Sequence, residues 1–209
     1  IVRPVENLRL GFAFHSPTIY RITETISDNI STYFSDEPLP YEASNNAEGY
    51  NYALTTPFRV MAGAAFQINK IALLSAEYEF VDYRTARFSE TGDDYNYSIK
   101  NQEIKNSLRS GNNLRLGAEV RLNKLYLRGG YNLYGRAWKG SDLNDELDYN
   151  AVSFGLGFRE QNLSIDFGFS RLTNPVNYIL YDSGLETAVS DMSVNRNIFS
   201  VTFGYRFNY

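Results

Sequence analysis

Charged side chains able to do chemistry occur in this chain mainly at alternate positions of otherwise apolar segments. Successive residues of a β-strand point to opposite faces, so these side chains are expected on one face of a sheet. Charges of both signs on one face can line an aqueous channel or pair with one another, and pairing is the favoured interpretation. The expected lumen-lining positions are Arg9, Arg59, Glu77, Arg115, Glu119, Arg128, Arg159 and Arg206.

No other pattern of residues indicates catalysis or metal binding. The chain has one histidine, His15, and no cysteine, so zinc spacing and a disulfide framework are both absent from the sequence. The acidic stretch 141–148 could offer oxygens to calcium, but it lacks the glycine and final glutamate of an EF-hand loop and is expected to be a solvated loop. Neither a nucleophile elbow nor a phosphate-binding glycine loop occurs. We therefore expect no enzyme, no metal and no cofactor.

The bulk composition fits a membrane protein that crosses by strands. A net charge of −4 over 209 residues gives no reason to expect a nucleic-acid partner. No apolar run approaches the roughly 20 residues of a spanning helix, whereas spanning strands alternate polar and apolar residues and escape such a search. The chain holds 17 Tyr, 14 Phe and 15 Gly. We interpret residues 1–209 as one domain.

Period-two alternation recurs in eight segments of suitable length to cross a bilayer as tilted strands. None of their apolar positions is charged, although 21% of the chain is charged. The segments are 8–14, 58–68, 72–80, 114–122, 125–133, 152–158, 163–169 and 199–209. This predicts an all-β, antiparallel transmembrane β-barrel with lipid against its apolar face.

The connections between these segments are short and long in alternation. Short turns are expected near Asn69-Lys70, Asn123-Lys124 and Gln161-Asn162, and long loops after the first segment and over 83–110, 137–149 and 171–195. Short periplasmic turns with long extracellular loops are typical of bacterial outer-membrane barrels, which predicts that location.

The first loop carries an apolar repeat of its own. Ser16-Pro17 resembles a helix start, and Ile19, Ile22, Ile26, Ile30 and Tyr33 recur at spacings of three and four. These positions predict a short amphipathic helix, although its many Thr and Ser residues are mediocre helix formers.

Both ends of the chain resemble known outer-membrane segments. Thr202, Gly204, Phe207 and Tyr209 match the C-terminal signal read by the outer-membrane assembly machinery; the alternative is an ordinary amphipathic strand. The run 3–18, RPVENLRLGFAFHSPT, resembles a stretch of the FadL/TodX-type hydrophobic-compound transporters. That resemblance implies a fourteen-stranded barrel with an N-terminal plug, of which this chain is the C-terminal portion. The start at Ile1 is accordingly interpreted as that of a fragment or processed product.

Glycines recur on the expected inner face. They either let another group approach the wall closely or relieve crowding and set curvature, and both interpretations stay open. The positions are Gly11, Gly63, Gly117, Gly130, Gly155, Gly157, Gly168 and Gly204.

Three functions compete. The resemblance implies passive uptake of small hydrophobic molecules such as long-chain fatty acids or aromatic compounds, with initial docking at Ile19, Ile22, Ile26, Ile30, Tyr33 and Phe34. A barrel of this kind can instead serve as an anchor, adhesin or secretion partner. A soluble ligand-binding barrel would turn the same apolar face inward, so that Phe12, Phe154, Phe167 and Phe203 would meet in a dry centre.

Overall fold

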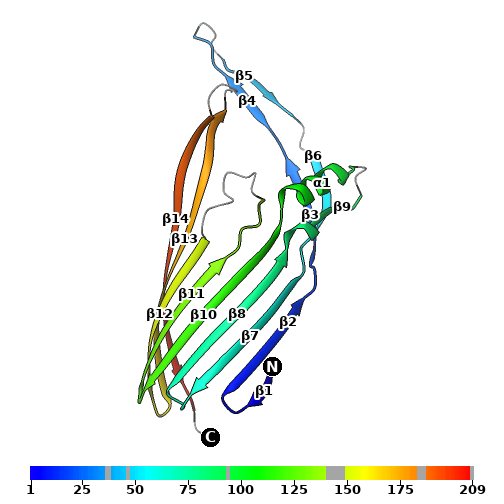
Figure 1. Ribbon diagram of the computed structural model, residues 1–209. Helices are drawn as coiled ribbons and strands as arrows, with labels where there is room; N and C mark the ends of the chain where they lie inside the picture. The colour runs from blue at the N-terminus through cyan, green and yellow to red at the C-terminus, as the bar shows by residue number, and fades with distance from the viewer. Residues whose placement is uncertain (36–38, 46–47, 93–94, 140–148, 183–186, 208–209) are drawn as a thin grey trace.

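The computed structural model is dominated by one curved antiparallel sheet (Figure 1). It describes residues 1–35, 39–45, 48–92, 95–139, 149–182 and 187–207. The nine strands follow the order β1-β2-β7-β8-β10-β11-β12-β13-β14. Each strand therefore pairs with the strands of this sheet that come directly before and after it along the chain. Their bounds are β1 Val2–Val5, β2 Leu8–His15, β7 Arg59–Ile68, β8 Ala72–Asp82, β10 Ser110–Leu122, β11 Leu125–Tyr134, β12 Tyr149–Glu160, β13 Leu163–Asp182 and β14 Thr187–Tyr205.

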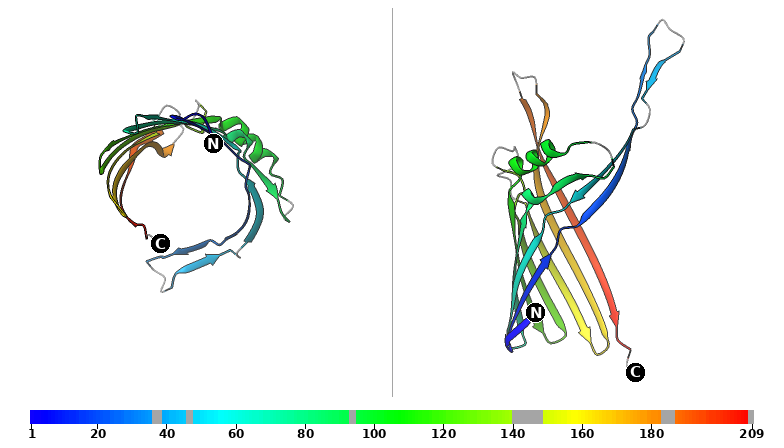
Figure 2. Two further views of the ribbon diagram at one scale, coloured as in Figure 1. Left: turned by 90° about the horizontal axis from the view of Figure 1, so that it is seen from below. Right: turned by 90° about the vertical axis from the view of Figure 1, so that its right-hand side faces the viewer.

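The sheet contains all eight predicted spanning strands and adds the short β1. Viewed along the strands, it curves through an arc and does not close on itself (Figure 2, left). The arc is the wall of part of a transmembrane β-barrel, which confirms the predicted fold class.

Tight turns join the strands at one end of the sheet, as predicted. Asn69, Lys70, Asn123 and Gln161 have φ values of 45°, 59°, 58° and 45°. Two-residue hairpin turns that match the twist of the strands need such positive φ values, and asparagine tolerates them better than most residues. The three turns therefore follow from local sequence.

The two faces of the sheet differ in polarity. Phe12, Phe154 and Phe203 are 71%, 65% and 73% exposed, whereas the side chains of Glu119 and Asp166 on the other face are only 15% and 24% exposed. Side chains crowd together on the concave side of a curved sheet and splay apart on the convex side. The apolar face is thus the outer one, which rules out the soluble barrel with a phenylalanine core.

A belt of polar residues ends the apolar outer face at the rim opposite the turns. Asp82, Asn112, Asn150, Arg171 and Asn197 end the run of outward apolar residues that starts near the tight turns. The register places these residues within two positions of one another across the sheet, because Asn112 pairs with Phe80, Asn150 with Thr173, and Arg171 with Asn197. We call this line the outer boundary, since lipid-facing polar residues are costly.

Smaller elements lie beyond the outer boundary (Figure 1). One is a three-stranded sheet of β3 Ile19–Ile26, β6 Glu48–Thr55 and β9 Arg87–Glu90, and another is the hairpin of β4 Asn29–Thr32 and β5 Tyr41–Ser44. The segment after β8 also forms the 3-10 helix η1 Tyr83–Thr85 and the helix α1 Ser98–Ser107. Among the described residues, no helix is both long enough and apolar enough to cross a membrane.

Two sequence predictions about these outer segments are wrong. The expected helix after Ser16 is instead β3 and β4, because the β-branched Ile and Thr residues favour strands and each residue of Ile19–Ile26 pairs with a residue of β6. The segment 171–195 is mostly strand, since β13 and β14 continue as a paired hairpin well past the outer boundary.

Candidate functional site

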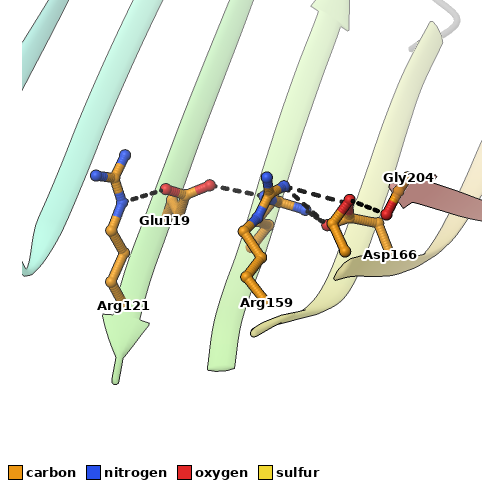
Figure 3. A network of polar contacts seen from close by, with 7 residues as sticks. Glu119, Arg121, Arg159, Asp166 and Gly204 are labelled. Atoms are coloured by element: carbon orange, nitrogen blue, oxygen red, sulfur yellow. Dashed lines mark hydrogen bonds and ion pairs between the residues drawn. The ribbon is translucent and has the colours of Figure 1, made fainter. Parts of the chain in front are cut away.

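A continuous chain of ion pairs crosses the concave face near the tight turns (Figure 3). Glu119 on β10 accepts from Nε of Arg121 and from Nε of Arg128, each at 2.7 Å. Asp166 on β13 accepts from Nη1 of Arg128 at 2.6 Å and from Nη2 of Arg159 at 3.2 Å. Three arginines and two carboxylates from four neighbouring strands therefore form one network, which we call the lower ion chain.

The ring of Tyr126 lies among the arginines of the lower ion chain. The guanidinium carbon of Arg159 is 4.9 Å from the ring centroid, and those of Arg121 and Arg128 are each 5.7 Å away. Cations at these distances are attracted to the face of an aromatic ring. Tyr126 thereby offsets part of the excess positive charge of this network.

A second polar cluster lies higher on the same face. Arg115 pairs with Glu77 and, at 3.5 Å, with Glu79; Glu79 also accepts from Nδ2 of Asn113 at 2.5 Å. Glu79 and Asn113 are buried, so their mutual hydrogen bond removes the cost of leaving either unpaired. Nearby, burial raises the pKa of Tyr83 in η1, and the Glu79 carboxylate adds to this shift.

Small residues separate the two clusters. The register places Ala65, Ser75, Gly117, Gly130, Ser153 and Ser170 side by side across six strands. A Cβ at Gly117 would lie 2.7 Å from Oγ of Ser75, and one at Gly130 would lie 2.6 Å from Oγ of Ser153. These glycines therefore give space to the serine of the neighbouring strand, and the wall stays thin along this band.

Two hollows open along this part of the wall. One of about 400 Å³ is lined by residues that include Arg9, Gly63, Glu77 and Arg115. The other, about 270 Å³, includes Ser153, Gly155, Gly168 and Ser200, with Arg128 and Asp166 below them. Both are shallow depressions, each large enough for a small organic molecule.

The remaining predicted lumen positions lie at the ends of the wall. Arg59 begins β7 and is paired in register with His15 and Val81 near the outer rim. Arg206 follows β14, where its backbone N–H donates to the carbonyl of Asn162 at 2.9 Å. Within the described part of the chain, neither Arg9 nor Arg206 forms an ion pair.

The residues expected to dock a ligand are split between faces. In β3, Ile22 and Ile26 point to one side and Ile19 to the other, because a strand alternates where a helix would have gathered them. Ile30 lies in β4, and Tyr33 and Phe34 follow it; all three are exposed. The structure therefore does not bring the six residues together as one surface.

An aromatic cluster on the outer sheet was not anticipated from the sequence. The rings of Tyr52 and Phe88 are 5.7 Å apart, and Tyr97 lies 6.2 Å from the first and 5.8 Å from the second. Asn101 of α1 fixes the arrangement by hydrogen bonds to the backbone N–H and carbonyl of Phe88. The alternation of Tyr50, Tyr52 and Leu54 was the available signal, but β9 and α1 come from a distant segment.

Part of the predicted assembly signal is described. Thr202 and Gly204 lie in β14 and Phe207 just after it, with Phe207 73% exposed; Tyr209 lies outside the described residues. The acidic stretch 141–148 is also outside them. In the ranges that the structure does describe, no group of three or more His, Cys, Asp or Glu could hold a metal ion.

The fold, with its apolar outer face and charged inner face, defines the wall of an outer-membrane β-barrel. No family model matches the sequence, and no curated protein matches it. Solved structures do: a Pseudomonas aeruginosa FadL homologue matches with a TM-score of 0.57 and 15% identity, over 98% of this chain and 50% of that one.

Two toluene transporters match in the same way. TbuX of Ralstonia pickettii has a TM-score of 0.54 at 16% identity, and the match covers 99% of this chain and 46% of the TbuX chain. TodX of P. putida has a TM-score of 0.54 at 14% identity, and the match covers 99% of this chain and 47% of the TodX chain. The chain thus has the FadL-type barrel fold, confirming the fold implied by the resemblance, and spans about half the length of these structures. They are transporters rather than enzymes.

Proposed function

We propose that this chain forms part of an outer-membrane barrel for passive uptake of small hydrophobic molecules, such as long-chain fatty acids or aromatic compounds. The observation that carries the proposal is the combination of exposed apolar surface beyond the outer boundary with an inner wall whose charges largely satisfy one another. The fold shared with toluene transporters supports it.

The paired charges argue against an ion-selective pore. Ion selectivity needs a field of one sign along the path. In the two clusters, Arg115, Arg121, Arg128 and Arg159 meet Glu77, Glu79, Glu119 and Asp166, so positive and negative groups are equal in number. A wall of this kind leaves the thin band and its hollows as the features that a neutral or amphipathic molecule would contact.

The outer elements would supply the first contacts. Ile22 and Ile26 share a face with Tyr52 and its aromatic neighbours, which makes a larger apolar surface than the docking positions alone. Ile19, Ile30, Tyr33 and Phe34 would contribute separately, on the other face of β3 and on the projecting hairpin of β4 and β5 (Figure 2, right).

Assembly of the barrel would use the end of β14. Thr202, Gly204, Phe207 and Tyr209 would be recognised by the outer-membrane assembly machinery while the edge of β14 is unpaired. Lipid would then surround the outer apolar face.

Uptake by cells carrying the full-length protein tests this function. Radiolabelled toluene and oleate should enter faster than into cells with an empty vector, while a neutral sugar of similar mass should not. A steady ionic conductance of the purified protein, with no uptake of either compound, would contradict the proposal. Capture of a stable protein partner by the outer loops without uptake would instead favour an anchor or adhesin, for which the far-reaching β4–β5 hairpin is suited (Figure 1).

A further inference from the structure

One cation points outward from β13 at the outer boundary. Arg171 lies two residues beyond Phe169, so strand alternation places it on the lipid-facing side, and it is exposed. A cation on this face of a barrel is costly in the middle of a bilayer and tolerated near the bilayer surface. Arg171 therefore lies at a depth where an anionic group outside the protein can reach it.

Within the described residues, no carboxylate neutralises Arg171. Its Nη2 donates to Oδ1 of Asn195 at 3.4 Å. The next outward carboxylate along the hairpin, Asp191, pairs in register with Asn177, which lies six residues, or about 20 Å, further along β13. A guanidinium carries five N–H donors in a rigid plane, so most of them are left for a partner outside the chain.

Elsewhere on the outer boundary, polar residues find partners within the protein. Asp82 accepts from Nε of Arg84 at 2.8 Å, so the two charges neutralise each other. Asn112 accepts from the hydroxyl of Tyr78 at 2.5 Å. The positive charge that faces outward at this depth is therefore concentrated at Arg171.

An aromatic pair lies directly below Arg171 on the same face. Phe169 and Phe199 are register partners, with ring centroids 4.9 Å apart, and Phe199 is 68% exposed. Aromatic side chains gather at the interfaces of membrane barrels, where the acyl chains end. Arg171 follows about 7 Å further along the strand, which is the depth of the lipid headgroups.

Neutral polar groups lie beside and above the guanidinium. Asn197 is the register partner of Arg171. Oδ1 of Asn195 accepts from Arg171 and, at 3.2 Å, from the hydroxyl of Thr173, while its Nδ2 donates to Oγ of Ser193 at 3.2 Å. Amides and hydroxyls suit the oxygens of phosphates and sugars, and they add no negative charge that would repel a phosphate.

The outward face of the hairpin thus changes in a fixed order with height. Aromatic rings come first, then the cation of Arg171, then amides and hydroxyls, on strands that rise past the rest of the main sheet (Figure 1). A glycolipid with phosphates on its sugars has the same order of acyl chain, phosphate and sugar hydroxyl. Arginine binds phosphate with paired, charge-assisted hydrogen bonds, which are stronger than neutral ones.

We infer that Arg171, with Asn195 and Asn197, binds the phosphate of a phosphorylated glycolipid in the outer leaflet, while Phe169 and Phe199 contact its acyl chains. This site lies on the outside of the barrel. It goes beyond the proposed uptake function and does not depend on it.

Two matched substitutions in the full-length protein test the site. Arg171→Gln removes the outward cation, and the control Arg196→Gln removes an exposed inward cation from the adjacent register pair, Leu172 with Arg196. The probe is lipid A, a glycolipid with two phosphates, and native mass spectrometry in mixed micelles measures its dissociation constant. R171Q should weaken binding about fivefold, the order expected for one cation at a membrane surface. R196Q should match wild type.

The lipid itself supplies a second test, which needs wild type alone. Enzymatically dephosphorylated lipid A should bind wild type about fivefold more weakly than lipid A does, and R171Q should not distinguish the two lipids. Inorganic phosphate at millimolar concentration should not displace lipid A, because it lacks the acyl chains. Displacement by inorganic phosphate would mean a site for free anions and would overturn the headgroup assignment.

The other outcomes are equally decisive. Equal binding of lipid A by R171Q and wild type would overturn the site, as would equal binding of lipid A and its dephosphorylated form by wild type. Equal losses in R171Q and R196Q would show general attraction between charges and no site at Arg171. Uptake of toluene and oleate should be the same in R171Q as in wild type, so a failure of the site leaves the uptake function standing.

Discussion

The lower and upper halves of the β13–β14 hairpin have the same strand backbone and different side-chain patterns. Both halves are antiparallel and keep one register from Leu163 to Ile179, yet outward positions are apolar in the lower half, as at Phe167, and mostly polar just above the outer boundary, as at Thr173 and Asn195. Backbone hydrogen bonding is indifferent to this change, because each residue pairs in the same way whichever face its side chain occupies. The comparison teaches that lipid requires apolar residues on the outward face of the lower half, whereas water beyond the outer boundary allows polar residues at outward positions such as Thr173 and Asn195.

A charge placed on the outer face should have the largest effect on stability, and the size of that effect should differ between the lower and upper halves of the hairpin. Phe167→Arg puts a cation into the apolar band and should lower the free energy of unfolding by about 2–4 kcal/mol. Thr173→Arg, on the same face above the outer boundary, should change it by less than about 1 kcal/mol. Guanidinium unfolding of the full-length protein in lipid vesicles measures both. Equal costs would place Thr173 within the lipid.

Filling the space beside Gly168 in the wall should have the next largest effect on stability. A Cβ at Gly168 would lie 2.6 Å from Oγ of Ser200, so Gly168→Val should cost about 1–3 kcal/mol of stability through overpacking. Ser200→Gly should recover most of this loss, because it removes the atom that clashes. The double-mutant cycle measures the coupling, and strictly additive effects would show that the two positions do not share space.

Breaking the lower ion chain should lower the free energy of unfolding by a smaller amount. Asp166→Asn leaves Arg128 and Arg159 without a carboxylate between them and should lower stability by about 1 kcal/mol, since all three groups are partly hydrated. Guanidinium unfolding of the full-length protein in lipid vesicles measures this loss. An unchanged free energy of unfolding would show that Asp166 contributes nothing to the stability of the wall.

The smallest effect is expected for a polar contact beyond the outer boundary. Tyr52 donates to Glu24 at 3.2 Å on an exposed face of the outer sheet. Glu24→Gln should change the free energy of unfolding by under about 0.5 kcal/mol, because the amide oxygen of glutamine can still accept this hydrogen bond and the site is exposed to water. A cost equal to that of Asp166→Asn would mean that the outer sheet is as integral to stability as the wall.

Local rules predicted the wall and failed beyond it. Strands such as β10 were predictable because apolar residues at every second position, Leu114, Leu116, Ala118 and Val120, indicate an apolar environment on one face and a polar one on the other. In the first outer segment, isoleucines at spacings of three and four pointed to a helix, yet pairing of β3 with β6 determined the conformation. The low helix propensities of Thr and Ser argued against a helix. The partner strand, however, begins more than twenty residues later, and no local pattern identifies it.

The candidate site was predictable in part for the same reason. Inward charges such as Glu119 and Arg128 could be assigned to a face from parity alone, but which of them pair depends on the stagger between strands. The cluster of Tyr52, Phe88 and Tyr97 could not be assigned, because it joins distant segments. The part of β13 and β14 beyond the outer boundary could not be predicted as strand either, since its Asn, Ser and Asp residues are typical of loops.

The sequence by itself determined the spanning strands, their tight turns and the face that each residue occupies, because the pleat of a strand and the positive φ of a two-residue turn are local properties. The tertiary structure alone decided which charges meet across strands, where the wall is thin, and how far the pairing of β13 and β14 continues beyond the outer boundary. Those features depend on register and curvature, which arise only when the strands are assembled side by side.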